Sequence, residues 1–191
     1  VAPTVFADGK TEGSHCSVCG TVIEKQNTIA KVPATIYLTA SSLKMKTGQS
    51  TTAFKATGFS EGDYVTAVTS NKPRTVKVTN VNKNGTFKLT AGKKKGSAVV
   101  TVTLASKKTA SFKVTVQKAA VKTTKITTTT KSLTLAKGAT YKKLASSIAV
   151  TPVTSKEKVT YSSSNKKVAT VSSKGVIKAK KAGTAKITVK S

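Results

Sequence analysis

The chemically reactive side chains of this sequence are concentrated in one short stretch, His15-Cys16-Ser17-Val18-Cys19-Gly20. Two cysteines separated by two residues and followed by glycine can aim two thiolates at one metal ion, as in a zinc knuckle. A closed structural zinc site needs four ligands, and Cys16, Cys19 and His15 supply three at most, because the sequence has no other cysteine or histidine. The stretch is therefore a candidate site with an incomplete ligand set.

Several alternatives stay open for Cys16 and Cys19. They can form a disulfide, remain free thiols in a hairpin, or bind zinc with Asp8, Glu12 or water completing the shell. Redox catalysis is not expected, because a thioredoxin-like role needs a βαβ context that the sequence lacks. His15 is equally unsupported as a catalytic base, since no nucleophile and orienting acid can be assigned to it. We therefore expect a non-enzymatic protein with no required cofactor.

Charge is the second feature of the chain. Among its 191 residues, 34 are basic and six are acidic, which gives a formal net charge of +28. Such a surface attracts polyanions through long-range fields that salt screens. Arg74 is the only arginine, and aromatic residues are few, so specific nucleic-acid binding is not expected. Lysine also keeps solvent faces soluble and protects exposed sheet edges from aggregation.

Acidic residues are unevenly placed. Glu61 and Asp63 lie in a glycine-rich loop that loosely suits calcium, although two carboxylates in so positive a chain favour a solvated loop. Glu157 is the only acid of the last third of the chain, too little to predict a lysine–asparagine crosslink there.

The elements that position these residues are predicted to be β-strands. Thr, Val, Ala, Lys, Ser and Gly dominate, and no window shows a sustained helical stripe of apolar residues. Alternation is clearest at Phe112–Val116, where Phe112, Val114 and Val116 share one face. Thr52–Ala56 is also predicted as a strand. Short strand signals separated by turns predict two packed antiparallel sheets. No apolar run is long enough to span a bilayer.

The last third of the chain repeats the middle third. Ser42–Gly48 returns as Ser132–Gly138, and Gly96–Val102 returns as Gly183–Val189. The second copy is shorter, because it lacks the hairpin that follows Gly96–Val102 in the first. We expect an all-β chain with a Cys-x-x-Cys hairpin module at 1–33 and two tandem Ig-like β-sandwich domains at 34–118 and 119–191.

Residues 161–171, Tyr-Ser-Ser-Ser-Asn-Lys-Lys-Val-Ala-Thr-Val, resemble the signature of bacterial Ig-like domains of group 2, and residues 172–189 continue the resemblance. The first repeat is similar to a divergent member that keeps the turn at Ser70–Pro73. The segment Ala2–Ile29 resembles short cysteine-containing modules that precede Ig-like repeats in Firmicutes surface proteins, which carry a further cysteine near the position of Val5. The resemblance implies an extracellular location on the bacterial cell surface and a role as a spacer or, in some cases, a binding module.

Two functional hypotheses follow. The first is a non-enzymatic stalk or adhesin segment of a larger bacterial protein, monomeric, whose lysines contact anionic cell-wall polymers or host glycans. The second is a carbohydrate-binding accessory module of a secreted glycoside hydrolase. It requires exposed aromatic side chains, for which the candidates are Tyr37, Phe59, Tyr64, Tyr141 and Tyr161.

Overall fold

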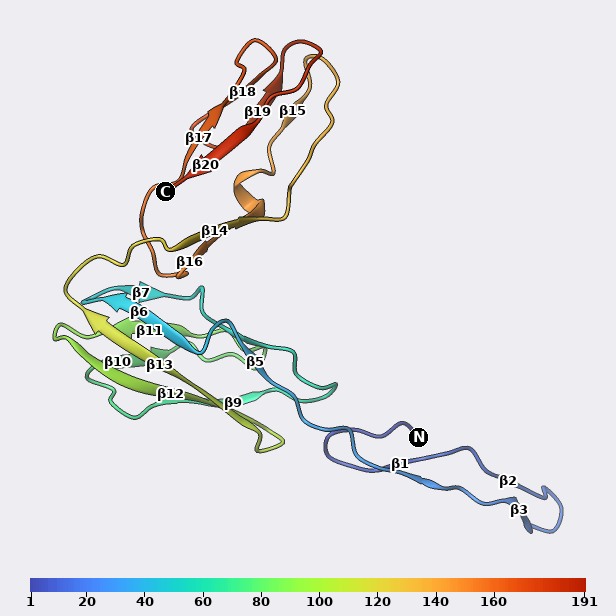
Figure 1. The fold of residues 1–191 in the computed structure, drawn as a ribbon. Helices are drawn as coiled ribbons and strands as arrows, with labels where there is room; N and C mark the ends of the chain where they lie inside the picture. The colour runs from blue at the N-terminus through green and yellow to red at the C-terminus, as the bar shows by residue number, and fades with distance from the viewer. The chain divides into compact units, whose positions relative to one another are not determined.

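The computed structural model describes residues 1–191 and shows an all-β chain with a single short 3-10 turn (Figure 1). The chain divides into two compact units, Val1–Lys118 and Ala119–Ser191. No helix in the structure is both long enough and apolar enough to cross a membrane.

Residues 1–33 form two short antiparallel strand pairs. β1 (Gly9–Lys10) pairs with β4 (Thr28–Ile29), and β2 (Ser14–His15) pairs with β3 (Val22–Glu24). Gly9 is the only buried residue of this module. A segment of this size with no buried side chain gains almost no hydrophobic stabilisation. Its backbone hydrogen bonds and the turn that contains the cysteines are therefore its main stabilising features.

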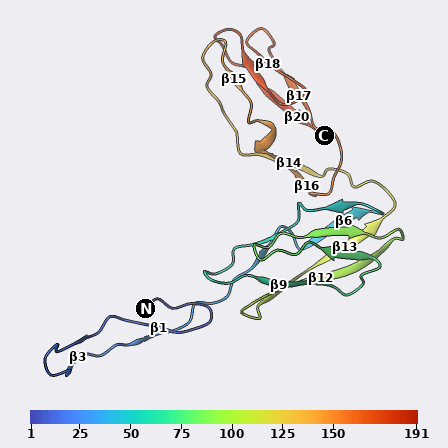
Figure 2. The same ribbon diagram turned by 180° about the vertical axis from the view of Figure 1, so that it is seen from behind.

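The first repeat contains nine strands. They are β5 (Tyr37–Leu38), β6 (Ser42–Lys46), β7 (Ser50–Thr51), β8 (Ala56–Thr57), β9 (Val65–Ser70), β10 (Val76–Thr79), β11 (Lys88–Ala91), β12 (Gly96–Leu104) and β13 (Thr109–Gln117). One sheet has the order β6-β13-β12-β9, and a second has the order β10-β11-β7, with β5 and β8 forming a separate pair (Figure 2). This is a β-sandwich rather than a closed barrel.

Three phenylalanines fill the centre of this sandwich. The rings of Phe54 and Phe112 stack with centroids 4.0 Å apart, and Phe87 lies 6.3 Å from each of them. Phe112 belongs to β13, and Phe87 directly precedes β11, so the cluster joins the two sheets. Aromatic packing of this kind adds to the stabilisation from burial alone.

The structure confirms the alternation predicted at Phe112–Val116, since Phe112, Val114 and Val116 are buried and Lys113 is exposed. Two details of the prediction are wrong. The sheet is not purely antiparallel, because β6 runs parallel to β13. Residues 52–56 do not form one strand either. The chain leaves the sheet after β7, places Phe54 in the core, and pairs again from Lys55, which forms an antiparallel bridge to Thr86 directly before β8.

The second unit contains seven strands and the 3-10 turn η1 (Ala145–Ser147). The strands are β14 (Lys125–Thr128), β15 (Thr140–Tyr141), β16 (Ile148–Thr151), β17 (Thr160–Ser163), β18 (Ala169–Val171), β19 (Ile177–Ala179) and β20 (Ile187–Lys190). Its pairings are β14-β16, β15-β19-β18 and β17-β20. Strand for strand, these repeat β5-β8, β7-β11-β10 and β9-β12 of the first unit.

The turn that ends each copy of the repeated sequence is also the same. Gly48 and Gly138 have φ of 74° and 85°, a backbone region that favours glycine. After each turn the residue that follows the glycine accepts an equivalent backbone hydrogen bond from a strand of the neighbouring sheet. Ala91 N–H donates to the Gln49 carbonyl at 2.8 Å, and Ala179 N–H donates to the Ala139 carbonyl at 3.0 Å. The turns at Gly48 and Gly138, and the backbone bonds that follow them, are therefore repeated in the structure.

Candidate functional site

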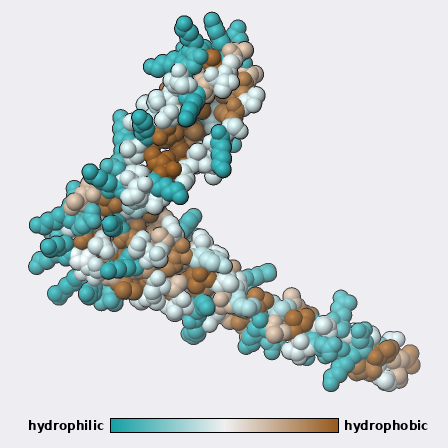
Figure 3. All heavy atoms as spheres, viewed as in Figure 1, coloured by the Kyte–Doolittle hydropathy of each residue, from teal (hydrophilic) through white to brown (hydrophobic).

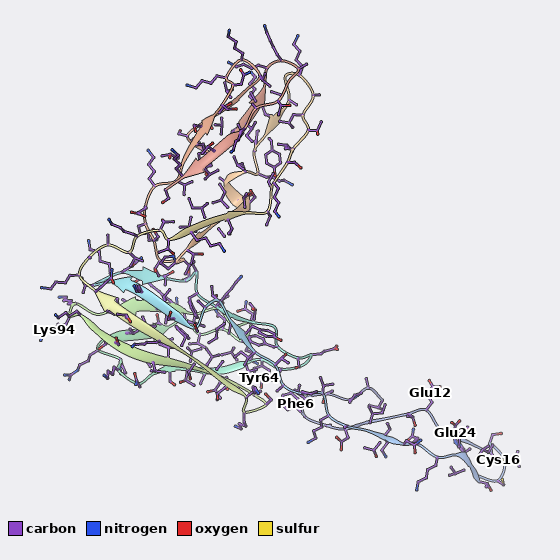
Figure 4. The ribbon with its side chains drawn as sticks, in the orientation of Figure 1. Phe6, Glu12, Cys16, Glu24, Tyr64 and Lys94 are labelled. Carbon is purple, nitrogen blue, oxygen red and sulfur yellow. The ribbon has the colours of Figure 1, made fainter.

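The Cys16–Thr21 turn is the tip of the β2–β3 hairpin, at the end of the N-terminal module where Figure 4 labels Cys16. Cys16 N–H donates to the Thr21 carbonyl at 2.8 Å, and Gly20 N–H donates to the Cys16 carbonyl at 2.9 Å. Gly20 has a φ of 73°, so a residue with a side chain would strain the turn. Cys19 N–H donates to Cys16 Sγ at 3.5 Å. The backbone thus folds both cysteines into one tight turn.

The two thiols are not equivalent. Cys19 Sγ lies 3.2 Å from Thr21 Oγ1, and its side chain is exposed, whereas Cys16 is half-buried. Hydrogen bonds from the Thr21 side chain and backbone, and from the Cys16 side chain, stabilise the thiolate and lower the pKa of Cys19 to about 7. A larger share of Cys19 is therefore thiolate, the nucleophilic form, at neutral pH than of an ordinary cysteine. The sequence analysis did not identify Thr21. Its position two residues after Cys19 is the feature that could have indicated it as a hydrogen-bond partner of the thiol.

The structure brings Cys16 and Cys19 together but adds no third ligand. No disulfide joins the two cysteines in the structure, and His15 is exposed in β2. Nowhere in residues 1–191 do three His, Cys, Asp or Glu side chains gather closely enough to hold a metal ion. Two sulfurs do not complete the tetrahedral set that a structural zinc site needs. Asp8 is engaged elsewhere, accepting a hydrogen bond from Lys31 N–H at 3.0 Å.

Apolar side chains surround the same turn. Val18, Val22 and Ile23 are 93%, 64% and 72% exposed, and the end of the module is visibly hydrophobic in Figure 3. The hairpin tip therefore combines a reactive thiol with side chains that water solvates poorly.

Asp63 has a structural role in the acidic loop. Its carboxylate accepts hydrogen bonds from the Ser106 hydroxyl at 2.6 Å and from Ser106 N–H at 3.2 Å, and Tyr64 N–H adds a third at 2.9 Å. Ser106 lies in the turn between β12 and β13, so Asp63 ties two loops at one end of the sandwich. Glu61 is exposed and takes no part in this contact. The loop brings no calcium ligand set together.

The aromatic candidates differ in exposure. Tyr37 is 66% exposed, and its ring lies against the Gly58 backbone, where a Cβ on residue 58 would come within 2.3 Å of Tyr37 Cδ2. Tyr64 is 37% exposed, and Lys83 Nζ lies 4.8 Å from its ring centroid, in a cation–π contact. Phe59, Tyr141 and Tyr161 are half-buried. Only Tyr37 therefore offers most of its ring to solvent.

A shallow depression of about 330 Å³ lies beside β17 and β18 in the second unit. Its lining is mostly hydroxyl-bearing, from Tyr161, Ser162, Ser163, Lys166, Thr170 and Val171. All six lining residues lie within residues 161–171, the stretch that carries the family resemblance, but their sequence pattern does not indicate a depression.

Lysines are spread over both units rather than gathered at one site. In Figure 3, hydrophilic residues are scattered over both units among neutral and hydrophobic ones. Lys93, Lys94 and Lys95 form the densest run, exposed in the turn between β11 and β12. Figure 4 places Lys94 at the end of the first sandwich opposite Tyr64. Positive charge is therefore dispersed over both units, with three consecutive exposed lysines in this one turn.

Comparison with known proteins gives one family match. Residues 122–191 match the family model of the Bacterial Ig-like domain (group 2), which covers less than half of the chain. A comparison with curated proteins gives no match.

Among solved structures, similar chains come from the S-layer protein SbsC. Domains 4 and 5 of that protein are 25% identical, with a TM-score of 0.37, over 48% of this chain and 57% of that chain. Domains 5–6 are 19% identical, with a TM-score of 0.43, over 82% of this chain and 89% of that chain. TM-scores this low do not carry a fold or a function over to the present chain.

Proposed function

We propose that this chain is a non-enzymatic structural segment of a larger bacterial cell-surface protein. In this proposal residues 1–33 form a cysteine-containing module, and residues 34–118 and 119–191 form two Ig-like sandwiches that hold other domains away from the cell. The observation that carries the proposal is the match of residues 122–191 to a bacterial Ig-like family, together with the structural repeat of that unit in the first sandwich. Buried side chains in the first sandwich are almost all apolar, so this domain has a packed core of its own.

The lysine surface is proposed to contact anionic wall polymers or host glycans by charge alone. A dispersed set of exposed lysines neutralises phosphates or sulfates wherever a flexible polyanion lies on the surface. Binding of this type weakens steeply with salt, because counterions are displaced when the polymer binds. The affinity of such binding also depends on the number of lysines more than on their positions.

The experiment measures binding of the full chain to purified wall teichoic acid and to a neutral wall polysaccharide as salt rises from about 50 to about 200 mM. A K93Q/K94Q/K95Q variant is compared with a control that removes three dispersed lysines, K118Q/K131Q/K174Q. We expect teichoic acid binding that falls at least tenfold with salt and is weakened similarly by both variants. Salt-insensitive binding, or loss in one variant alone, would contradict a charge-only contact.

Carbohydrate binding is the second candidate, and the exposure of Tyr37 favours it. A solvent-facing ring beside a glycine backbone can stack on a sugar face. Saturable binding of a neutral polysaccharide that Y37A abolishes, and that Y141A leaves intact, would establish this function. Absence of such binding across a panel of neutral glycans would remove it.

A further inference from the structure

The turn at the hairpin tip is built like half of a tetrahedral thiolate site. Gly20 N–H donates to the Cys16 carbonyl at 2.9 Å, and Gly20 has a φ of 73°, so the chain folds back directly after Cys19. Cys19 N–H also donates to Cys16 Sγ at 3.5 Å, and hydrogen bonds of this kind orient a metal-bound sulfur. Two sulfurs from one such turn fill two corners of a tetrahedron, and zinc needs four ligands.

The other two ligands do not come from the same chain. Within residues 1–191 no third His, Cys, Asp or Glu side chain gathers with the two cysteines. His15 is exposed in β2, and Asp8 accepts a hydrogen bond from the backbone of Lys31. The hairpin module also has no packed core that would bring a distant ligand to the turn. Two corners of the tetrahedron are therefore open to a second molecule.

The side chains around the turn suit a contact surface. Every residue of 17–30 is exposed, and three of them are large and apolar, namely Val18, Val22 and Ile23. Val18 lies between the two cysteines, and the other two lie in β3, directly after the turn. Figure 4 labels Cys16 at this end of the module. Burial of these side chains against a partner is favourable, because water solvates them poorly.

Charge does not oppose a meeting of two copies at this turn. Residues 11–24 contain two acids, Glu12 and Glu24, and no lysine or arginine, in a chain whose formal net charge is +28. The lysines elsewhere on two copies repel one another, but salt screens that repulsion beyond about 8 Å at physiological ionic strength. Two copies can therefore approach at the hairpin tip without opposing lysines.

We propose that one zinc ion joins two copies of this chain tip to tip, each copy contributing Cys16 and Cys19 to a four-thiolate site. The missing half of the site has the same chemistry as the half that is present, so a two-fold axis through the metal completes it. Val18, Val22 and Ile23 of both copies pack around the metal. Zinc displaces the protons of the four thiols, so the step needs no oxidant or reductant. This dimerisation is independent of the lysine contacts proposed above.

The metal is necessary because the apolar contact alone is small. A stable protein interface takes about 20–30 residues from each side, and a hairpin tip offers far fewer. Zinc bound by four thiolates supplies the remaining binding free energy. The dimer therefore forms with zinc and dissociates when a chelator removes the metal.

The test titrates zinc into the reduced, metal-free full chain, prepared without an affinity tag. Analytical ultracentrifugation gives the mass, and native mass spectrometry gives the number of zinc ions bound. We expect a monomer in chelator, and with zinc a dimer that holds one metal ion and protects all four thiols from alkylation. Cobalt in place of zinc should give the visible absorption of tetrahedral thiolate coordination.

Variants separate this site from its alternatives. C16S/C19S should abolish the zinc-dependent dimer, and H15A should retain it, because His15 is not a ligand. V18S should weaken the dimer about tenfold or more, since it removes one buried side chain from each copy. V81S is the matched control, because it removes an exposed valine of the first sandwich and should leave the dimer unchanged.

Salt distinguishes this proposal from polyanion binding by the lysines. Raising it from about 50 to about 200 mM should leave the zinc dimer intact while it weakens the binding of teichoic acid. A monomer that binds one zinc ion per chain, a chain that binds none, loss of zinc binding in H15A, or a dimer that survives the chelator would each overturn the inference.

Discussion

The clearest quantitative prediction compares one substitution at two equivalent positions. Leu43 and Leu133 begin the same repeated motif, but Leu43 is 3% exposed and Leu133 is 42% exposed. Leu43→Ala removes a fully buried side chain and leaves a cavity between β6 and the core, which costs about 2–5 kcal/mol. Leu133→Ala removes a side chain only a little more than half buried, at a site open to water. This substitution loses only part of the free energy gained by burying the side chain and leaves no cavity. Its cost in unfolding free energy is therefore about 1 kcal/mol or less.

The assay is urea unfolding of the full chain, with backbone amide resonances reporting on each unit separately. L43A should shift the midpoint of the first unit strongly and leave that of the second unchanged, and L133A should move only the second, slightly. An L133A cost as large as that of L43A would refute the reasoning, because it would mean that Leu133 is as well covered as Leu43.

Three further predictions concern single contacts. Thr21→Val removes the largest influence on the Cys19 thiolate, so the midpoint of Cys19 alkylation by iodoacetamide should move from about pH 7 upward, and an unmoved midpoint would contradict the assignment. Glu157→Gln should destabilise the second unit at neutral pH, because the hydrogen bond from Thr123 N–H lowers the pKa of Glu157 in the folded state. The stabilisation from this carboxylate is present above its unfolded-state pKa and is lost as pH falls through its folded-state pKa. In urea unfolding the stabilities of variant and parent should therefore differ at neutral pH and converge in acid. Gly85→Ala should cost about 1–3 kcal/mol in urea unfolding, because Gly85 has a φ of 83° and a Cβ there would come within 2.2 Å of the residue-56 carbonyl oxygen; a neutral effect would show that this turn adjusts freely.

The sequence predicts those parts of the fold that depend on local pattern. Alternation at Phe112–Val116 identifies both the strand and its buried face, and the repeated Thr-Gly and Lys-Gly turns mark Gly48 and Gly138 as equivalent. The parallel pairing of β6 with β13 was not predictable in this way. It joins residues far apart in the chain, and the alternation within a strand is the same for parallel and antiparallel neighbours.

Ser132–Ala136 shows how the same sequence pattern can have two outcomes. Its residues repeat those of β6, yet only β6 is a strand, because a strand needs a partner for its backbone groups. Local pattern records the propensity of a segment, while the partner comes from elsewhere in the fold.

The candidate site was predictable only in outline. The spacing of Cys16 and Cys19 and the glycine that follows them predict the tight turn that the structure contains. The lowered pKa of Cys19 depends on where the Thr21 hydroxyl lies, which spacing does not give. Asp8 and Glu12 are near the cysteines in sequence, but the hairpin module has no core that would fold them back onto the turn as metal ligands. Mass spectrometry of the purified chain with and without zinc distinguishes the disulfide, free-thiol and zinc-bound states predicted for Cys16 and Cys19.

The most direct test of this account is amide hydrogen exchange on the unmodified full chain, comparing β12 with β20. The second unit repeats the strand pairings of the first, and within the described residues β20 pairs with β17 alone. We therefore expect the amides of β12 to exchange slowly along the whole strand, whereas in β20 the amides bonded to β17 exchange slowly and the alternate amides exchange fast. Uniformly slow exchange along β20, or fast exchange at Leu43 matching that at Leu133, would contradict it.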